Sequence, residues 1–264
     1  MDIQKSDIDG GKAFDWGKTS ADYAKYRDIY PAAFYDAILS RGFCKSGQRV
    51  LDLGTGTGVL PRNLYHAGAA WCGTDISPEQ IEQAKKLAES AGMKIDFRTA
   101  SAETTDYPDG SFDIVTACQC WWYFDAARVY PNIARMLKKD GVLVLLYMGW
   151  LAEEDAIAAE SERLVLKYNP AWTGAGDVRH PITPPEAAFA SFTMTEQTVF
   201  DLPVHFSRES WHGRMRACRG VGASLPPEQL AAWDSEHRAM LAQKAPETFD
   251  IQHYAAITVL TKNA

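Results

Sequence analysis

The sequence predicts an α/β fold, in which a doubly wound, mostly parallel sheet carries helices on both faces. Short apolar runs alternate with helical stretches over the first 148 residues, which is typical of parallel strands joined by crossover helices. The first such strand, around Val50–Leu53, leads directly into the loop Gly54-Thr55-Gly56-Thr57-Gly58. A second strand ends on Asp75, roughly 20 residues after the loop begins, as in nucleotide-binding α/β units.

The first half is expected to hold two opening helices and then alternating strands and helices. Ser77 and Gln80 form a capping box with Pro78 at the first helical position, and Gly92 is a plausible helix stop. The expected helices cover 20–27, 32–41, 58–67, 78–90 and a stretch that ends near Leu137, and the expected strands cover 49–53, 70–74, 95–99, 112–117 and 142–147.

The junction before the fifth strand is expected to be a helix end followed by a tight turn. Pro131 is expected either to start or to kink the preceding helix. Lys138 and Lys139 suit the negative end of that helix, and Asp140-Gly141 is expected to turn the chain into the strand.

The second half is expected to contain more helix. Residues 169–185, rich in Pro, Gly and Trp, are expected to form a loop, and Thr183 and Glu186 form a second capping box before a short helix. The other expected helices cover 153–168, 208–218 and 227–243, and the expected strands cover 192–202 and 251–261.

Composition and charge restrict the class of protein. The chain of 264 residues is 46% hydrophobic and 23% charged, with a net charge of −7, so it is expected to be globular and to bind neither nucleic acid nor an anionic membrane. Its first residues contain no apolar signal segment, and a cytoplasmic location is expected. The pair Cys118 and Cys120 has no second pair at zinc-site spacing, so no metal site is predicted.

The glycine loop indicates which cofactor the chain binds. Val59 stands where a dinucleotide fingerprint needs its third glycine, and Asp52 stands two residues before the first one. A carboxylate at the mouth of the loop would repel a pyrophosphate and attract an ammonium or sulfonium group. These residues favour S-adenosylmethionine (SAM) over a nicotinamide dinucleotide.

The stretch from Asp52 to Gly58 resembles the first motif of the class I SAM-dependent methyltransferases, D-x-G-x-G-x-G, and the chain resembles their type 11-like small-molecule branch. The resemblance implies a seven-stranded sheet in the order 3-2-1-4-5-7-6 with the last strand antiparallel. It implies one methyltransferase domain over residues 1–264, with a SAM-binding core at 20–148 and a helical cap at about 203–249.

The resemblance also implies a set of cofactor-binding residues. Asp75 would bind the ribose hydroxyls, Ile76 would pack on the adenine, and the amide of Ala102 would donate to it. Ser101 replaces the usual aspartate, so it is either a weaker adenine contact or a turn residue. Arg27 either holds the methionine carboxylate or is a surface arginine. The full set is Tyr23, Arg27, Asp52, Gly54, Thr55, Gly56, Gly58, Asp75, Ile76, Ser101, Ala102, Glu103, Cys118 and Gln119.

Three residues are candidates for catalysis. Trp122 and Tyr123 follow the fourth strand, where aromatic faces attract a sulfonium and exclude water. Relatives often carry histidine where this chain has Trp122, which cannot accept a proton. Either the acceptor therefore arrives ionised, or His180 from the 169–185 loop supplies the base. The remaining histidines of the second half are expected to be structural: His205, His212, His237 and His253.

These features predict a SAM-dependent methyltransferase that acts on a small molecule. The alternatives are a protein or RNA methyltransferase, an NAD-dependent oxidoreductase, and a module that binds SAM without turnover. A basic stretch is expected either to contact an anionic substrate or to form a solvated helix face. It contains Arg214, Arg216 and Arg219. The acceptor atom (O, N, S or C) and the oligomeric state are left open.

Overall fold

A computed structural model describes residues 3–263, which form two compact units. The sheet unit consists of Tyr30–Met148, His180–Phe200 and the described residues from Ala255 onward. The helical unit consists of the described residues up to Ile29, together with Gly149–Arg179 and Asp201–Tyr254. No described helix is both long enough and apolar enough to cross a membrane.

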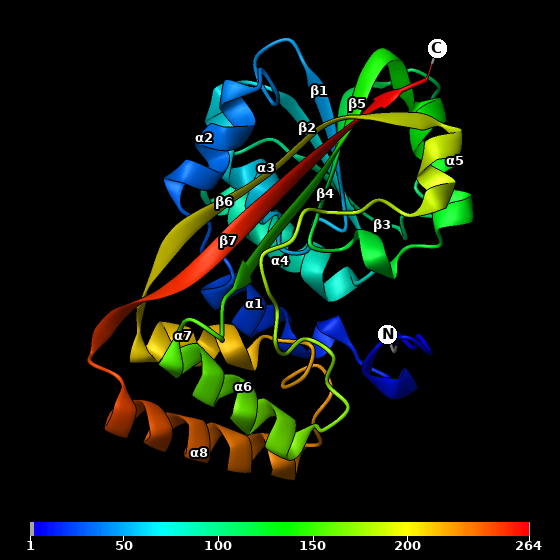
Figure 1. The fold of residues 1–264 in the computed structure, drawn as a ribbon. Coiled ribbons are helices and arrows are strands. Elements are labelled where there is room, and N and C mark those ends of the chain that lie inside the picture. The colour runs from blue at the N-terminus through cyan, green and yellow to red at the C-terminus, as the bar shows by residue number, and fades with distance from the viewer. Residues whose placement is uncertain (1–2, 264) are drawn as a thin grey trace. The chain divides into compact units, whose positions relative to one another are not determined.

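The strands form one seven-stranded sheet in the order β3-β2-β1-β4-β5-β7-β6 (Figure 1). Neighbouring strands from β3 to β5 pair in parallel, and the sequence-predicted order is confirmed. The strands are β1 Arg49–Leu53, β2 Ala70–Asp75, β3 Asp96–Thr99, β4 Phe112–Cys118, β5 Leu137–Trp150, β6 Phe192–Ser207 and β7 Thr248–Lys262.

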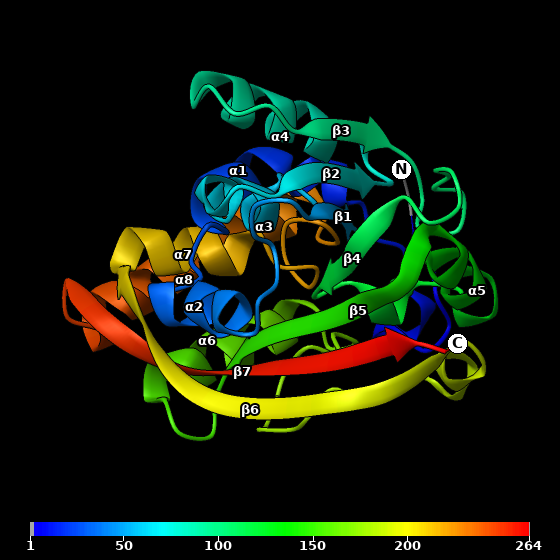
Figure 2. The same cartoon turned by 90° about the horizontal axis from the view of Figure 1, so that it is seen from above.

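The last two strands form a long antiparallel hairpin, which Figure 2 shows along its length. The amide of Asn263 donates to the Ser191 carbonyl over 3.0 Å, and near the other end that of Arg208 donates to the Glu247 carbonyl over 3.1 Å. Pairing continues well beyond the predicted limits, so β6 has 16 residues and β7 has 15.

The predicted turn at Asp140-Gly141 is wrong, because these residues lie inside β5. The pairing of β4 with β5 shifts between Phe112 and Ile114, so the extra residues are absorbed as a bulge in the strand. Lys138 lies directly after Leu137, the C-cap residue of α5 (Ala126–Met136). Its ammonium lies 2.8 Å from the Asp113 carboxylate on β4.

The helices of the sheet unit begin and end mostly where the sequence predicts. At the start of α4, the Ser77 hydroxyl accepts a bond from the Gln80 amide over 3.3 Å. Pro131 lies inside its helix. The predicted capping box at Thr183 is wrong, because Pro185 precedes a 3-10 turn that has no side-chain cap. The elements are α2 Ala32–Ser40, α3 Val59–Asn63, α4 Pro78–Ser90, α5 Ala126–Met136 and the 3-10 turns Tyr65–Ala67, Trp121–Tyr123 and Glu186–Ala190.

The core of the sheet unit lies between the strands and these helices. Val50, Leu51 and Leu53 of β1 are fully buried, as expected for a strand covered on both faces. On one side α4 packs Ile81 and Ala84 against Phe97 of β3. This packing holds the carboxyl ends of β1 and β2 in place, where the glycine loop and Asp75 lie.

The helical unit contains α1 Ser20–Tyr26, α6 Ala156–Tyr168, α7 Arg208–Arg216 and α8 Pro227–Lys244, with 3-10 turns at Asp9–Gly11 and Trp16–Thr19. Helix α6 packs on α8, and α7 packs on both α1 and α8. The predicted cap segment, about 203–249, therefore packs with α1 and α6 in one unit. Its role as a cap stays a prediction.

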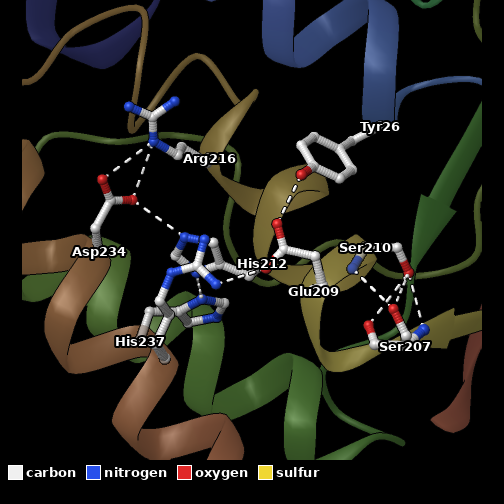
Figure 3. A network of polar contacts seen from close by, with 9 residues as sticks. Tyr26, Ser207, Glu209, Ser210, His212, Arg216, Asp234 and His237 are labelled. Atoms are coloured by element: carbon white, nitrogen blue, oxygen red, sulfur yellow. Dashed lines mark hydrogen bonds and ion pairs between the residues drawn. The ribbon is translucent and has the colours of Figure 1, made fainter. Parts of the chain in front are cut away.

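A chain of polar contacts links helices of this unit, and Figure 3 shows the part of it formed by His237, His212 and Asp234. The indole of Trp211 donates to Ser161 over 2.9 Å, and Ser161 lies 2.9 Å from Nε2 of His237. The two Nδ1 atoms of His237 and His212 are 2.9 Å apart, and Nε2 of His212 lies 3.2 Å from the Asp234 carboxylate. The Ser161 hydroxyl also lies 2.8 Å from the Ile157 carbonyl oxygen. The donor and acceptor roles of the two neutral imidazoles therefore depend on which of these partners receives the single hydroxyl hydrogen of Ser161.

Burial keeps three histidines of this unit neutral. It lowers the pKa of His237 and of His253 to about 3 and lowers that of His212 to about 4. In the unfolded chain these groups titrate near 6.5. The unfolded state therefore takes up protons first as the pH falls below about 6.5, and the histidines lower the stability of the fold in acid.

We expect the free energy of unfolding to fall as the pH drops from about 6.5 towards 4. Replacing one buried histidine, His237→Gln, should reduce that slope by up to about 1.4 kcal/mol per pH unit, one proton's worth. Urea denaturation at several pH values measures it. The control is His205→Gln, because the His205 side chain is 69% exposed. Equal slopes for His237→Gln and the wild type would contradict this account.

Candidate functional site

The glycine loop after β1 has a backbone that only glycine adopts without strain. Gly54, Gly56 and Gly58 have φ angles of 64°, 55° and 73°, in the left-handed region. A Cβ on Gly58 would lie 2.5 Å from a ring carbon of Phe97, and one on Gly54 would lie 2.8 Å from Cys120 Sγ. The loop is therefore packed tightly between β3 and the turn that follows β4.

Asp75, at the end of β2, fastens this loop. One carboxylate oxygen accepts from the Gly56 amide over 2.8 Å, and the other accepts from the Ser77 amide over 2.9 Å. Burial raises the pKa of Asp75, and these amide bonds oppose the rise. Each carboxylate oxygen has two lone pairs, so Asp75 retains acceptor capacity for hydroxyl groups of a ligand.

Asp52 is placed differently from the prediction. Its residue is only 2% exposed, so the carboxylate does not stand at an open mouth of the loop. The Thr116 hydroxyl on β4 donates to it over 2.6 Å. Burial, and less strongly the charge of Asp75, raise the pKa of Asp52 to about 6. At neutral pH the carboxyl group is therefore mostly ionised beneath the surface of the site.

The segment after β3 forms a compact turn. The Ser101 carbonyl accepts from the hydroxyl of Thr105 over 2.8 Å, and the Ser101 hydroxyl accepts from the Thr104 amide over 3.2 Å. These bonds agree with the alternative of Ser101 as a turn residue. Ala102 is buried, and Glu103 accepts from the Asp125 amide at the start of α5 over 2.8 Å.

The segment after β4 contains a backbone strain that the sequence did not reveal. Gln119 has a φ of 57°, which is uncommon for any residue except glycine. Its amide donates to the Leu146 carbonyl over 2.9 Å, and its side chain donates to the Tyr30 hydroxyl over 2.9 Å. The same hydroxyl lies 3.3 Å from Cys118 Sγ. Tyr30 is a residue that sequence reasoning missed, because no spacing rule links positions so far apart.

An aromatic group lies beyond this turn and includes two of the predicted catalytic residues. The ring centroids of Trp122 and Tyr123 are 5.4 Å apart, and those of Trp122 and Tyr147 are 5.8 Å apart. Trp121 packs on Trp122 at 4.6 Å. None of these four aromatic residues is fully buried. Tyr147 was also missed. It ends the strand predicted at 142–147, and the carboxyl ends of parallel strands are where ligands bind in such sheets, so its position could have indicated a site residue.

His180, the predicted base, joins this aromatic group. Its ring centroid lies 5.7 Å from that of Tyr147. Its Nδ1 lies 3.0 Å from the Pro181 carbonyl oxygen, which can only accept, so the hydrogen is assigned to Nδ1. The lone pair of the neutral imidazole is then on Nε2, the nitrogen that can take a proton from another group.

Two predicted cofactor residues belong to the helical unit. The Arg27 guanidinium donates to the Tyr23 hydroxyl over 3.3 Å and lies 4.7 Å from the centre of its ring. Every other predicted site residue belongs to the sheet unit. In the basic stretch, Arg216 pairs with Asp234 and Asp22.

Arg219, also in the basic stretch, pairs with the buried Asp9 over 2.8 Å. The positive charge of Arg219 is therefore balanced by a carboxylate of the same unit. Among the described residues, no three His, Cys, Asp or Glu side chains are grouped to hold a metal ion.

Comparisons with known proteins agree with this arrangement. Residues 51–145 match the family described as "Methyltransferase domain". The chain is 30% identical over 145 residues to the uncharacterized methyltransferase Rv3342 of Mycobacterium tuberculosis, covering 52% of this chain and 56% of that protein. It is 30% identical over 156 residues to a ubiquinone biosynthesis O-methyltransferase of Cereibacter sphaeroides, covering 59% and 62%. The matches therefore span less than two thirds of these relatives.

The fold agrees as well. The crystal structure of the YcgJ protein from Bacillus subtilis superimposes with a TM-score of 0.56 at 20% identity, covering 89% of this chain and 100% of that one.

We expect Asp52→Asn to stabilise the protein. The folded-state pKa of about 6 lies above the usual 3.8, so ionisation costs stability as the pH rises through this range. At about pH 8 the variant should gain up to about 3 kcal/mol in the free energy of unfolding, and at about pH 4 much less. Urea denaturation at both pH values tests this, with the exposed Asp140→Asn as the control. A variant less stable than wild type at pH 8 would contradict the burial argument.

Proposed function

We propose that this protein transfers a methyl group from SAM to a small-molecule acceptor, because residues 51–145 match the methyltransferase-domain family and the chain has the class I methyltransferase fold. The observation that carries the proposal is the glycine loop fastened by Asp75. SAM supplies an electrophilic methyl group on a sulfonium and leaves as a neutral thioether.

The residues present fit this cofactor. The absent Cβ atoms of Gly54 and Gly58 make room for Cys120 and Phe97, which pack the loop into a fixed turn, and Gly56 adds no side chain between that backbone and a ligand. Asp75 has acceptor capacity left for two vicinal ribose hydroxyls. The ionised Asp52 makes the site favourable for a cation and unfavourable for a pyrophosphate.

The aromatic group supports a role in alignment and exclusion of water. Aromatic faces stabilise a nearby cation, and in-line displacement from a sulfonium depends mainly on positioning. Trp122 cannot serve as the base, since an indole only donates. The base is therefore His180 through Nε2, or the acceptor arrives ionised.

A small molecule is the proposed acceptor, with oxygen the first acceptor atom to test. The named O-methyltransferase relative supports oxygen, and the net charge of −7 weighs against a nucleic-acid substrate. The experiment that tests turnover is incubation with methyl-labelled SAM and a pool of metabolites. A labelled product supports the proposal, whereas binding without any labelled product would make the chain a SAM-binding module.

We expect S-adenosylhomocysteine (SAH), the demethylated cofactor, to bind with a Kd in the micromolar range. This Kd corresponds to a binding free energy on the order of −8 kcal/mol. Asp75→Ala should weaken binding by about 2–4 kcal/mol, since it removes a charged acceptor and releases the loop amide of Gly56. Isothermal titration calorimetry measures both values, with Asp140→Asn as the control. Binding of NADH, or SAH affinity unchanged in Asp75→Ala, would contradict the assignment.

Once an acceptor is found, His180→Gln decides how its proton is removed. If His180 is the base, kcat should fall about a hundredfold or more while the KM of the acceptor stays near its wild-type value. If the acceptor arrives ionised, kcat should change by less than about threefold. The control is His205→Gln, an exposed histidine paired with Asp250.

A further inference from the structure

Gln119 is one of only three non-glycine residues with positive φ among residues 3–263. A left-handed backbone at such a residue costs on the order of 1 kcal/mol or more and persists only where its surroundings enforce it. Such outliers cluster at ligand sites.

Tyr30 supplies a rigid anchor for the strained residue. Its ring stacks on Phe34 with centroids 4.6 Å apart and planes 15° apart, and Phe34 is completely buried. The Tyr30 hydroxyl accepts from Nε2 of Gln119 over 2.9 Å and contacts Cys118 Sγ over 3.3 Å. One phenol on a fixed ring therefore touches two consecutive side chains of the turn.

The turn adjoins the glycine loop directly. Cys120 Sγ donates to the Leu53 carbonyl over 3.1 Å, and it fills the space that a Cβ on Gly54 would need. The Gln119 backbone is bonded to Leu146 on the other side. A change in the orientation of Gln119 therefore occurs next to the backbone that would hold the cofactor.

We propose that Tyr30 is a positioning residue for cofactor binding, which acts by fixing the Gln119 side chain through its hydroxyl. This inference rests on the proposed function. With Nε2 bonded to Tyr30, the oxygen Oε1, a pure acceptor, is the amide atom that would bind a ligand group. The group that such an oxygen recognises is a cationic donor, and the α-ammonium of the methionine portion, present in SAH as well as in SAM, is that group.

A double-mutant cycle on SAH binding tests the linkage. Tyr30→Phe removes the hydroxyl and keeps the ring stacked on Phe34. We expect it to weaken SAH binding about tenfold, equivalent to 1.4 kcal/mol. Gln119→Ala should weaken binding at least as much, and the double variant should be no weaker than Gln119→Ala alone, because Tyr30 acts through Gln119. The matched control is Tyr35→Phe, which removes a hydroxyl from the neighbouring ring that also packs on Phe34 and should leave affinity unchanged.

The strain gives a second measurement that needs no ligand. Gln119→Gly relieves the left-handed backbone, so it should raise Tm by a few degrees while SAH affinity falls about tenfold or more. A purely structural glutamine predicts an SAH affinity that is unchanged in this variant, so the loss of affinity is the result that separates the two roles.

The possible results distinguish a failure of the role of Tyr30 from a failure of the proposed function. SAH binding by the wild type with unchanged affinity in Tyr30→Phe overturns the role of Tyr30 and leaves the proposed function intact. Additive losses in the double variant also overturn it, since the two residues would then act independently. No SAH binding by the wild type overturns the proposed function, and the role of Tyr30 with it.

Discussion

The bond between the Asp75 carboxylate and the Gly56 amide is the contact on which the candidate site depends. It joins the end of β2 to the middle of the glycine loop, and the second oxygen of the same carboxylate holds the first turn of α4 through Ser77. One side chain thereby fixes a loop with left-handed residues to two regular elements. The same carboxylate is proposed to accept hydrogen bonds from the ribose hydroxyls. The shape of the loop and the recognition of the ligand therefore depend on one residue.

Asp52 illustrates the cost of placing charge in such a site. Burial raises its pKa to about 6, and hydrogen bonds from the Thr116 and Thr55 side chains offset only part of the lost solvation. A carboxylate in this position is unfavourable for the empty fold and favourable once a cation is bound. Gln119 presents a similar conflict through its backbone. Both residues are locally unfavourable in the fold and lie next to the glycine loop, where function supplies a reason for them.

The sequence predicted most of the fold because its signals were local. The strand before Gly54, the cap at Ser77 and the order of strands followed from short-range patterns and from the family resemblance. The failures were not local. Asp140-Gly141 reads as a turn, but pairing with β4 and the ion pair of Lys138 keep it in β5.

In the site, glycine spacing identified the loop and the acid after β2, both of which are fixed by sequence distance. It could not show that Asp52 is buried, since the depth of a side chain depends on what β4 places over it. Tyr30 was missed for the same reason, because its partner Gln119 comes from a distant part of the chain.

The central claim is that the Asp75-fastened loop is a SAM site. A crystal structure of the protein with SAH tests it most directly. The account predicts that both ribose hydroxyls donate to the Asp75 carboxylate, with the Gly56 amide still bonded to the same group. A ribose bound elsewhere, or an Asp75 carboxylate with no contact to the ligand, would contradict it.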